Sequence, residues 1–224
     1  MKPPKQYEIH TYSKLEEQLN IWSHFAGLLL SVVALILLVF KAIALGNIWV
    51  LISFPIFGLS MIVLYLASTL YHFSETPKLR YRLNIFDHAA IYVLIAGSYT
   101  PFVLVSLNGP EGFTIFSIVW SIALIGIIFK IFFTGRFNVL STLLYVAMGW
   151  LIIFSFKSLL NSLDFNGVAW LIGGGIAYTV GAVLYSIDRL KFNHAIFHLF
   201  VLLGTFCHFI SVYFYVIPVS GHHQ

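Results

Sequence analysis

The sequence predicts an all-α integral membrane protein in which seven helices cross the bilayer, with the N-terminus in the cytoplasm and the C-terminus outside. Three observations support this prediction. Of the 224 residues, 60% are hydrophobic and only 9% are charged, against about 25% charged in an average soluble domain. Apolar segments near the roughly 20 residues that span a bilayer recur along the whole chain. Lysine and arginine gather at alternate ends of these segments, as the loops of a membrane protein require.

Each apolar segment lies between residues that end helices. The segments are, in order, Leu19–Leu45, Ile48–Tyr71, Ile85–Leu107, Phe113–Phe133, Val139–Phe156, Val168–Ile187 and His194–Val216. The first follows a polar arm and is longer than the apolar region of a signal peptide, which favours a retained helix. The breaks between them are Gly46-Asn47, Thr76-Pro77, Asn108-Gly109-Pro110, Gly135-Arg136, the polar run 161–167 and the run 188–193. The chain thus divides into a short cytoplasmic arm (1–18), a seven-helix membrane domain (19–217) and a short external tail (218–224).

Counting cations in alternate connecting segments gives the orientation, because short cytoplasmic loops accumulate positive charge. Ten fall on one side, namely Lys2, Lys5, Lys14, Lys78, Arg80, Arg82, Lys130, Arg136, Arg189 and Lys191. The other side receives only Lys41 and Lys157. The side with ten cations is therefore predicted to be cytoplasmic.

Charge and cysteine content exclude some partners. The formal net charge is +4, but the cations are scattered in short segments without a basic stripe, so no nucleic-acid partner is expected. The single cysteine, Cys207, excludes an internal disulfide and a cysteine-rich metal site. The partner expected is a membrane lipid or fatty acid inside the helix bundle.

Ionisable residues that are far apart in the sequence fall at one end of the predicted bundle. His72 ends the second helix, Asp87 lies near the start of the third, and His194 and His198 begin the seventh. The i, i+4 spacing of His194 and His198 stacks both rings on one helical face, about 6 Å apart along the axis. Ionisable groups within a membrane are costly and usually functional. Their convergence predicts a buried metal centre near the cytoplasmic surface.

The ligand types favour Zn²⁺ in a catalytic type of site, because structural zinc sites are closed by a fourth protein ligand. His72, His194 and His198 would supply three nitrogens, leaving a position for water. Asp87 would either accept a proton from that water or ligate the ion directly. Ser68, one turn before His72, would hold the attacked carbonyl or orient a ligand.

A simpler interpretation stands beside this one. A single histidine in a helix is most often packed and bonded to a backbone carbonyl, and an H-x-x-x-H pair arises by chance. A third histidine and an aspartate at the same depth favour the metal site.

Three further histidines are accessory candidates. His24, in the first helix, is as well suited to bonding a neighbouring helix as to supporting the metal ligands. His88 follows Asp87. His208 lies on the face of His198 but about 15 Å deeper, which favours an interhelical hydrogen bond or a cavity-lining role over a second metal. Cys207 is expected to pack, and His10, His222 and His223 belong to the solvated ends.

Two runs of small residues predict packing features. Gly173-Gly174-Gly175, with Ala177 and Gly181, gives the sixth helix a surface for close helix approach. The run Gly97-Ser98-Tyr99-Thr100-Pro101 predicts a kink near the middle of the third helix.

The chain resembles the hemolysin III family, the bacterial branch of the progestin and adipoQ receptor family that includes the adiponectin receptors. The motifs that carry the resemblance are Glu17-x-x-Asn20-x-x-x-His24, Ser68-x-x-x-His72, Asp87-His88, Gly97-Ser98-Tyr99-Thr100-Pro101, Tyr145-x-x-x-Gly149-Trp150, Gly175-x-x-Tyr178-x-x-Gly181 and His194-x-x-x-His198 with His208. They cover nearly the whole chain.

The resemblance implies seven helices in a bacterial plasma membrane and a zinc ion near the cytoplasmic surface. Three histidines hold it in the family, matching His72, His194 and His198. The Asp87 match contacts zinc through water, and the Ser68 match lies beside it. The family is grouped with alkaline ceramidases among membrane metal-dependent hydrolases, and its bacterial members are associated with membrane-lipid homeostasis.

Three functions compete. The first is a zinc-dependent, ceramidase-like hydrolase of a lipid amide or ester. The second is a sensor or regulator in which zinc is structural and a bound lipid shifts the conformation. The third, suggested by the family name, is a pore-forming cytolysin, although the sequence has no polar stripe to line a pore.

Overall fold

The computed structural model describes residues 12–134 and 137–218, and every regular element within them is helical. The elements are α1 (Lys14–Leu45), α2 (Ile48–Phe73), α3 (Pro77–Pro101), the π-helix η2 (Phe102–Ser106), α4 (Pro110–Phe133), α5 (Asn138–Gly149), the 3₁₀-helix η3 (Leu151–Ser155), α6 (Phe156–Ser162), α7 (Phe165–Tyr185) and α8 (Asn193–Tyr215). Within these ranges, seven helical spans are long and apolar enough to cross a membrane. The predicted all-helical, seven-span fold is confirmed.

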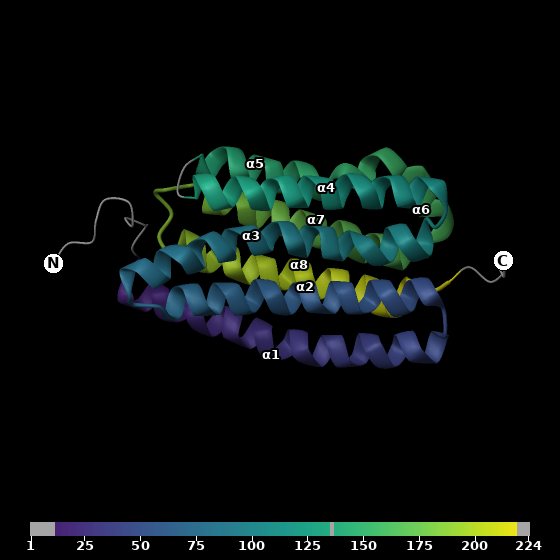
Figure 1. The fold of residues 1–224 in the computed structure, drawn as a ribbon, viewed down its shortest axis with the longest axis horizontal. Coiled ribbons are helices and arrows are strands. Elements are labelled where there is room, and N and C mark those ends of the chain that lie inside the picture. Colours follow the sequence, from purple (N-terminus) through teal and green to yellow (C-terminus); the bar gives the residue numbers. More distant parts are fainter. Residues whose placement is uncertain (1–11, 135–136, 219–224) are drawn as a thin grey trace.

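The helices run side by side along the long axis of the molecule (Figure 1). We call the end where α1 and α8 begin the N-terminal end. Because successive spans alternate in direction, α2, α4 and α7 finish there, and α3 and α5 start there. The ends of α2 and α8 that carry the predicted ligands therefore meet at one end of the bundle.

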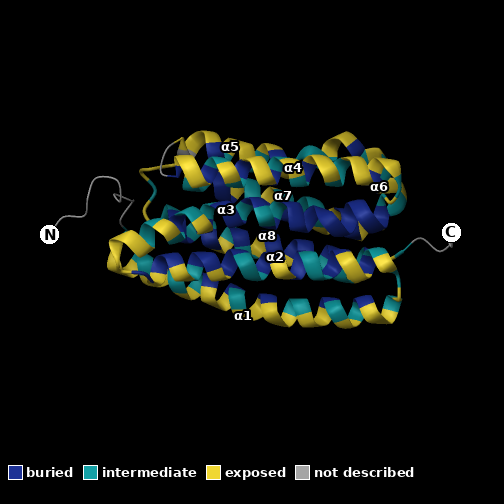
Figure 2. Cartoon of the chain, viewed as in Figure 1, coloured by how far each residue is buried: buried dark blue, intermediate teal, exposed yellow. Residues whose placement is uncertain are grey.

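The third span is the central helix of the bundle. In its most apolar 18-residue window 83% of the residues are buried, against 17% in α1. Figure 2 shows the same contrast, with the second half of α3 mostly dark blue and much of α1 and α4 yellow. The outer faces carry exposed apolar side chains such as Phe40 and Phe132, as a surface that faces lipid requires.

Capping residues explain several helix ends. Gly46 ends α1 in the left-handed conformation, with φ of 63°, which favours glycine. The next residue, Asn47, accepts hydrogen bonds from the backbone N–H groups of Trp49 and Val50 and so begins α2. Asp164 caps α7 in the same way through the N–H of Asn166. The predicted Gly46-Asn47 break is thus a turn with no other residue between the helices.

The third helix begins eight residues earlier than predicted. It starts at Pro77 rather than Ile85, because proline is preorganised for the first helical position. Lys78, Arg80 and Arg82 therefore lie on the first turns of α3 and not in a loop. Lys130, also counted as a connecting residue, lies in the last turn of α4. The earlier start of α3 places the run at 97–101 nearer the far end of the span, where the helix continues as a π-helix after Pro101.

The fifth span is interrupted where one continuous helix was predicted. Its α-helix ends at Gly149, and a 3₁₀-helix leads into α6. The Tyr99 hydroxyl lies at this break: it donates to the carbonyl of Gly149 at 2.7 Å and accepts from the N–H of Ile152 at 2.9 Å. A side chain from α3 thus replaces part of the helical hydrogen bonding of the fifth span.

Glycines of α7 allow α8 to pack closely against it. A Cβ atom at Gly174 would overlap the ring of His208, and one at Gly181 would lie 2.6 Å from the Cβ of Phe200. Gly173, in contrast, has no atom within 4 Å of the position that its Cβ would take. The predicted small-residue surface is therefore narrower than the glycine run suggests.

Gly174→Ala is expected to destabilise the protein by about 1–3 kcal/mol, the usual cost of overpacking. The added methyl group must displace the His208 ring, which is bonded to the Leu171 carbonyl. Thermal unfolding in detergent measures the effect. Gly173→Ala is the control and should leave the midpoint unchanged or raise it slightly; equal destabilisation by both changes would contradict this packing.

Candidate metal centre

Three histidines from two helices converge at the N-terminal end. His72 comes from the last turn of α2, and His194 and His198 from the first two turns of α8. One ring nitrogen of each lies within 4.8 Å of the corresponding nitrogens of the other two. The residues are only 3%, 5% and 2% exposed, respectively. The structure thus brings together the three ligands that the sequence predicted.

The donor geometry fits a metal ion. The Nε2 atoms of His72 and His194 are 3.1 Å apart. Two nitrogens bound tetrahedrally at about 2.0–2.1 Å from Zn²⁺ lie roughly 3.3 Å apart. Two unprotonated nitrogens at this distance would repel each other, and a cation between them replaces that repulsion with attraction.

Polar groups of α1 and the residues before it contact the opposite side of each ring. The Nδ1–H group of His72 donates to Glu17 Oε2 at 2.7 Å. Nδ1 of His194 lies 3.1 Å from the Tyr12 hydroxyl, and Nδ1 of His198 lies 3.3 Å from Ser23 Oγ. Such contacts on Nδ1 leave Nε2 available for a metal and orient the ring.

The contacts of Tyr12 and Ser23 with these rings were not predicted from the sequence, where Glu17 stood only within the motif Glu17-x-x-Asn20-x-x-x-His24. One signal was available, because Glu17, Asn20 and His24 share one face of α1 by their spacing. The Nδ2 atom of Asn20 lies 3.5 Å from Nδ1 of His72. Burial raises the pKa of the Tyr12 phenol, so its hydroxyl stays neutral beside His194.

Arg80 holds Glu17 in place. Its guanidinium forms an ion pair with Glu17 Oε1. It also donates to the backbone carbonyls of His72 at 3.3 Å and Ser74 at 3.1 Å, and it lies over the ring of Tyr71. An arginine, a carboxylate and an imidazole therefore form a continuous chain of contacts into the centre.

Glu17→Gln is expected to weaken metal binding by about 10- to 100-fold, as is typical when the partner of a ligating histidine is changed. The amide keeps the shape of the side chain but removes the charge that the His72 ring and Arg80 contact. Competition with a chelator of known affinity measures the change. Glu75→Gln, at an exposed position, is the control, and equal affinities for the two variants would argue against a role for Glu17.

Asp87 and Ser68 are the two predicted site residues outside the three-histidine cluster. Both are buried and line the same cavity as His194 and His198. Asp87, on α3, is outside the group of mutually close ligand atoms. Its Oδ2 is 4.0 Å from Nδ1 of His88, which donates to the Asn84 carbonyl. The Ser68 hydroxyl is buried and has no hydrogen-bond partner among the described residues.

His24 and His208 occupy different positions. The His24 ring is stacked on that of His198, with centroids 3.5 Å apart and an angle of 8° between the planes. Neither of its nitrogens has a hydrogen-bond partner within the described part of the chain. His208 lies deeper, where its Nε2 is 3.3 Å from the Leu171 carbonyl. His10, His222 and His223 lie outside the described residues.

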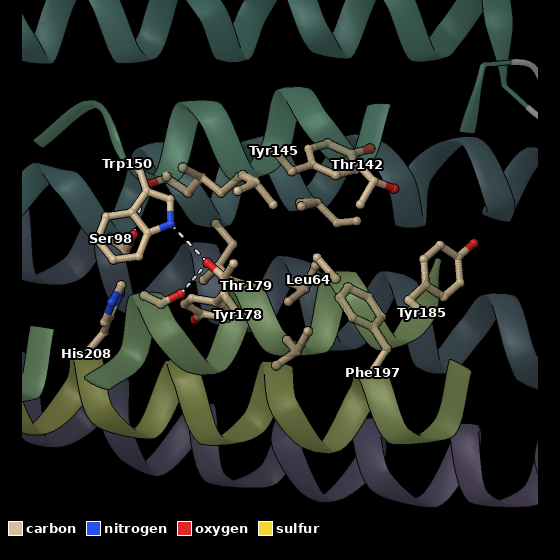
Figure 3. A pocket seen from close by; sticks show the side chains of 18 of the residues that line it. Leu64, Ser98, Thr142, Tyr145, Trp150, Tyr178, Thr179, Tyr185, Phe197 and His208 are labelled. Atoms are coloured by element: carbon tan, nitrogen blue, oxygen red, sulfur yellow. Dashed lines mark hydrogen bonds between the residues drawn. The ribbon is translucent and has the colours of Figure 1, made fainter. Parts of the chain in front are cut away.

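A cavity of about 370 Å³ extends from the histidine cluster into the bundle. Its walls are mostly apolar and come from all seven spans, chiefly α3, α5, α7 and α8. Figure 3 shows Tyr185 and Phe197 toward one end and Trp150 and His208 toward the other. The indole N–H of Trp150 donates to Thr179 at 2.9 Å. His194 and His208 both line the cavity, so it extends about 21 Å along α8.

The fold and the site define a class: a multi-pass membrane protein of seven helices with a buried three-histidine cluster that could hold a metal ion. The chain belongs to the Haemolysin-III related family, whose sequence pattern matches residues 12–209.

Its relatives include bacterial and animal proteins. It is 48% identical to Hemolysin-3 of Bacillus cereus over 206 residues, which cover 92% of this chain and 94% of that protein. It is 50% identical to the Hemolysin-3 homolog of Bacillus subtilis (strain 168) over 204 residues, or 91% and 96% of the two chains. Over 174 residues it is 28% identical to the human Monocyte to macrophage differentiation factor, covering 75% of this chain and 72% of that one.

Proposed function

We propose that this protein is a zinc-dependent hydrolase of a lipid amide or ester. The observation that carries the proposal is the three-histidine cluster at one end of a long apolar cavity, which is also lined by the Asp87 carboxylate and by Ser68, whose hydroxyl has no hydrogen-bond partner among the described residues. Three imidazoles without a thiolate suit Zn²⁺ among the available metals. The mostly apolar lining suits an acyl chain, and the volume lies in the usual range for small-molecule sites.

His72, His194 and His198 would hold the ion. A bound Zn²⁺ supplies a Lewis acid that acidifies water and polarises a carbonyl group.

The remaining chemistry belongs to residues of this chain. Asp87 accepts a proton from the attacking water and returns it to the leaving amine or alcohol as the acyl C–N or C–O bond breaks. The Ser68 hydroxyl, which has no partner among the described residues, donates a hydrogen bond to the carbonyl oxygen. Because Ser68 and His72 are one turn apart on α2, this hydroxyl and the metal ligand face the same region.

The test is fatty-acid release from a panel of N-acyl and O-acyl lipids by purified, zinc-loaded protein in detergent. Release is expected to rise toward neutral pH, where zinc sites acidify water. Removal of the metal with a chelator should abolish release, and added Zn²⁺ should restore it. Failure of zinc-loaded protein to release fatty acid from any lipid of the panel would count against the hydrolase.

A membrane sensor or regulator is the second candidate. It is favoured by the contacts around the cluster, because His72 of α2 meets Glu17 of α1 and His194 of α8. A metal held there would join α2 to α8, the Glu17 contact would connect α1 to the same site, and a lipid in the adjoining cavity would shift the arrangement of the three helices. In that case the protein has no hydrolase activity, and its effect on membrane lipids requires metal but not Asp87.

We further propose that the N-terminal end of the bundle faces the cytoplasm, because ten of the twelve cations were assigned to that side. In a background with Cys207 changed to alanine, a cysteine at Glu75 or Lys191 should react only with a reagent that reaches the cytoplasm. A cysteine at Glu111 or Asn161 should react with an impermeant reagent added outside. All four positions are exposed, so reversed labelling would invert the orientation.

A further inference from the structure

We propose that Lys130 forms a binding site for the anionic headgroup of a lipid-like ligand, one with a carboxylate or phosphate group on an apolar tail. The proposal requires neither hydrolysis nor a particular metal. It rests on the surroundings of the lysine and on the cavity that it lines.

Lys130 is a fully buried lysine in the last turn of α4, with no exposed surface. Its ammonium donates to Ser141 Oγ of α5 at 2.6 Å. The Ser141 hydroxyl donates in turn to the Phe137 carbonyl at 3.1 Å. An ammonium carries three N–H donors, and this neutral hydroxyl is its one hydrogen-bond acceptor among the described residues.

No protein counter-ion balances this charge within residues 12–134 and 137–218. The carboxylates there that form ion pairs are Glu17, with Arg80 and His72, and Asp87, with His88. Arg80, a partly buried cation at the same end of the bundle, is paired with the carboxylate of Glu17. Removing an unpaired charge from water is energetically costly, and a partner charge offsets this cost best.

Two weaker sources of stabilisation do not replace a counter-ion. Cations in the last turn of a helix are favoured by the helix dipole, but only weakly in comparison with an ion pair. The ring of Tyr145 lies 5.9 Å from the ammonium, at the outer limit of a cation–π contact. Lysines near membrane surfaces commonly extend their charge to water. Lys41 is partly exposed in this way, whereas Lys130 is not.

The cavity defines the class of ligand. Lys130 lines the same mostly apolar cavity as Asp87 and the histidines. Tyr145, labelled in Figure 3, connects the two regions: its ring faces the ammonium, and its hydroxyl donates to the carbonyl of His88 at 3.0 Å. An anion at Lys130 therefore binds near Asp87, with its tail along the apolar walls. Charge-assisted hydrogen bonds to the ammonium supply affinity.

Competition binding with purified protein in a neutral detergent tests the proposal. The bound probe is radiolabelled palmitate, and the competitors are hexadecyl phosphate, palmitate, hexadecanol and inorganic phosphate. Wild-type protein should prefer the two anionic lipids to hexadecanol by about 10- to 100-fold, as expected for a hydrogen bond to a charged group. Inorganic phosphate should not compete at millimolar concentration, because it has no tail. Competition by phosphate as strong as that by hexadecyl phosphate would overturn the lipid assignment.

Variants locate the anion. Lys130→Met should lose the preference for anions, while Lys130→Arg should keep it. Lys41→Met is the matched control and should bind as wild type does. Ser141→Asp supplies a carboxylate beside the ammonium, so it should also abolish the preference for anions. This variant tests the proposal if Lys130→Met does not fold. Metal content should equal that of wild type in every variant.

Three results would overturn the proposal. The first is an unchanged preference for anions in Lys130→Met. The second is equal binding of hexadecanol and the anions by wild type, which would make Lys130 a neutral packing residue. The third is a preference that disappears on metal removal but survives Lys130→Met, which would place the anion on the metal.

Discussion

Changing both His194 and His198 to alanine is expected to reduce the bound metal from about one ion per chain to almost none. The double variant leaves His72 as a single imidazole, and one ligand does not hold Zn²⁺ against water. Because the cluster joins α2 to α8, loss of the ion should also lower the thermal midpoint. A ligand at 1,000 times its dissociation constant contributes about 4 kcal/mol to stability. Elemental analysis and thermal unfolding measure the two effects.

His208→Ala is the control for this experiment. It removes a buried histidine from the same helix, and with it the contact to the Leu171 carbonyl, but leaves the cluster intact. It should keep a full complement of metal. Complete metal retention by the His194→Ala, His198→Ala double variant would refute the proposed ligands.

Asp87→Asn is expected to keep most of the metal and to lose lipid hydrolysis by about 10²- to 10⁴-fold, the usual contribution of a general acid–base group. The three histidines remain, and the amide matches the carboxylate in size but cannot accept a proton. His72→Ala should instead lose metal and activity together. Metal analysis and fatty-acid release on the same preparations separate the two effects.

The control for the Asp87 experiment is Asp188→Asn, which changes an exposed aspartate between α7 and α8 and should have wild-type activity. Loss of metal in Asp87→Asn would make Asp87 a ligand and not a proton acceptor. If zinc-loaded wild-type protein releases nothing while Asp87→Asn restores the membrane-lipid composition of a deletion strain, the sensor explains the result better.

The number of spans and the identity of the clustered histidines could be predicted from the sequence. Span number follows from the length of apolar segments, because a bilayer requires about 20 apolar residues per helix. The clustering of the histidines follows from the direction of the spans. Because consecutive spans reverse direction, the end of the second span and the start of the seventh must lie at the same end of the bundle. His72, His194 and His198 needed only these two rules to be placed together.

Helix interruptions were harder to predict, because they depend on contacts between spans. The break after Gly149 is stabilised by the Tyr99 hydroxyl from α3, 50 residues away in the sequence. Nothing in the apolar run itself indicates that such a partner will be present.

Sequence alone thus determined the class of protein, its seven spans and the three histidines of the candidate metal site. Tertiary structure decided that Glu17, Tyr12 and Ser23 contact those histidines, and that Lys130 is buried in the cavity. The physical reason is that side-chain contacts depend on how each helix is rotated about its own axis and on which helices it packs against. A helix that is apolar on every side, as α4 nearly is, has a sequence pattern that indicates neither its rotation nor its neighbours. Packing between the helices therefore determines which side chains meet.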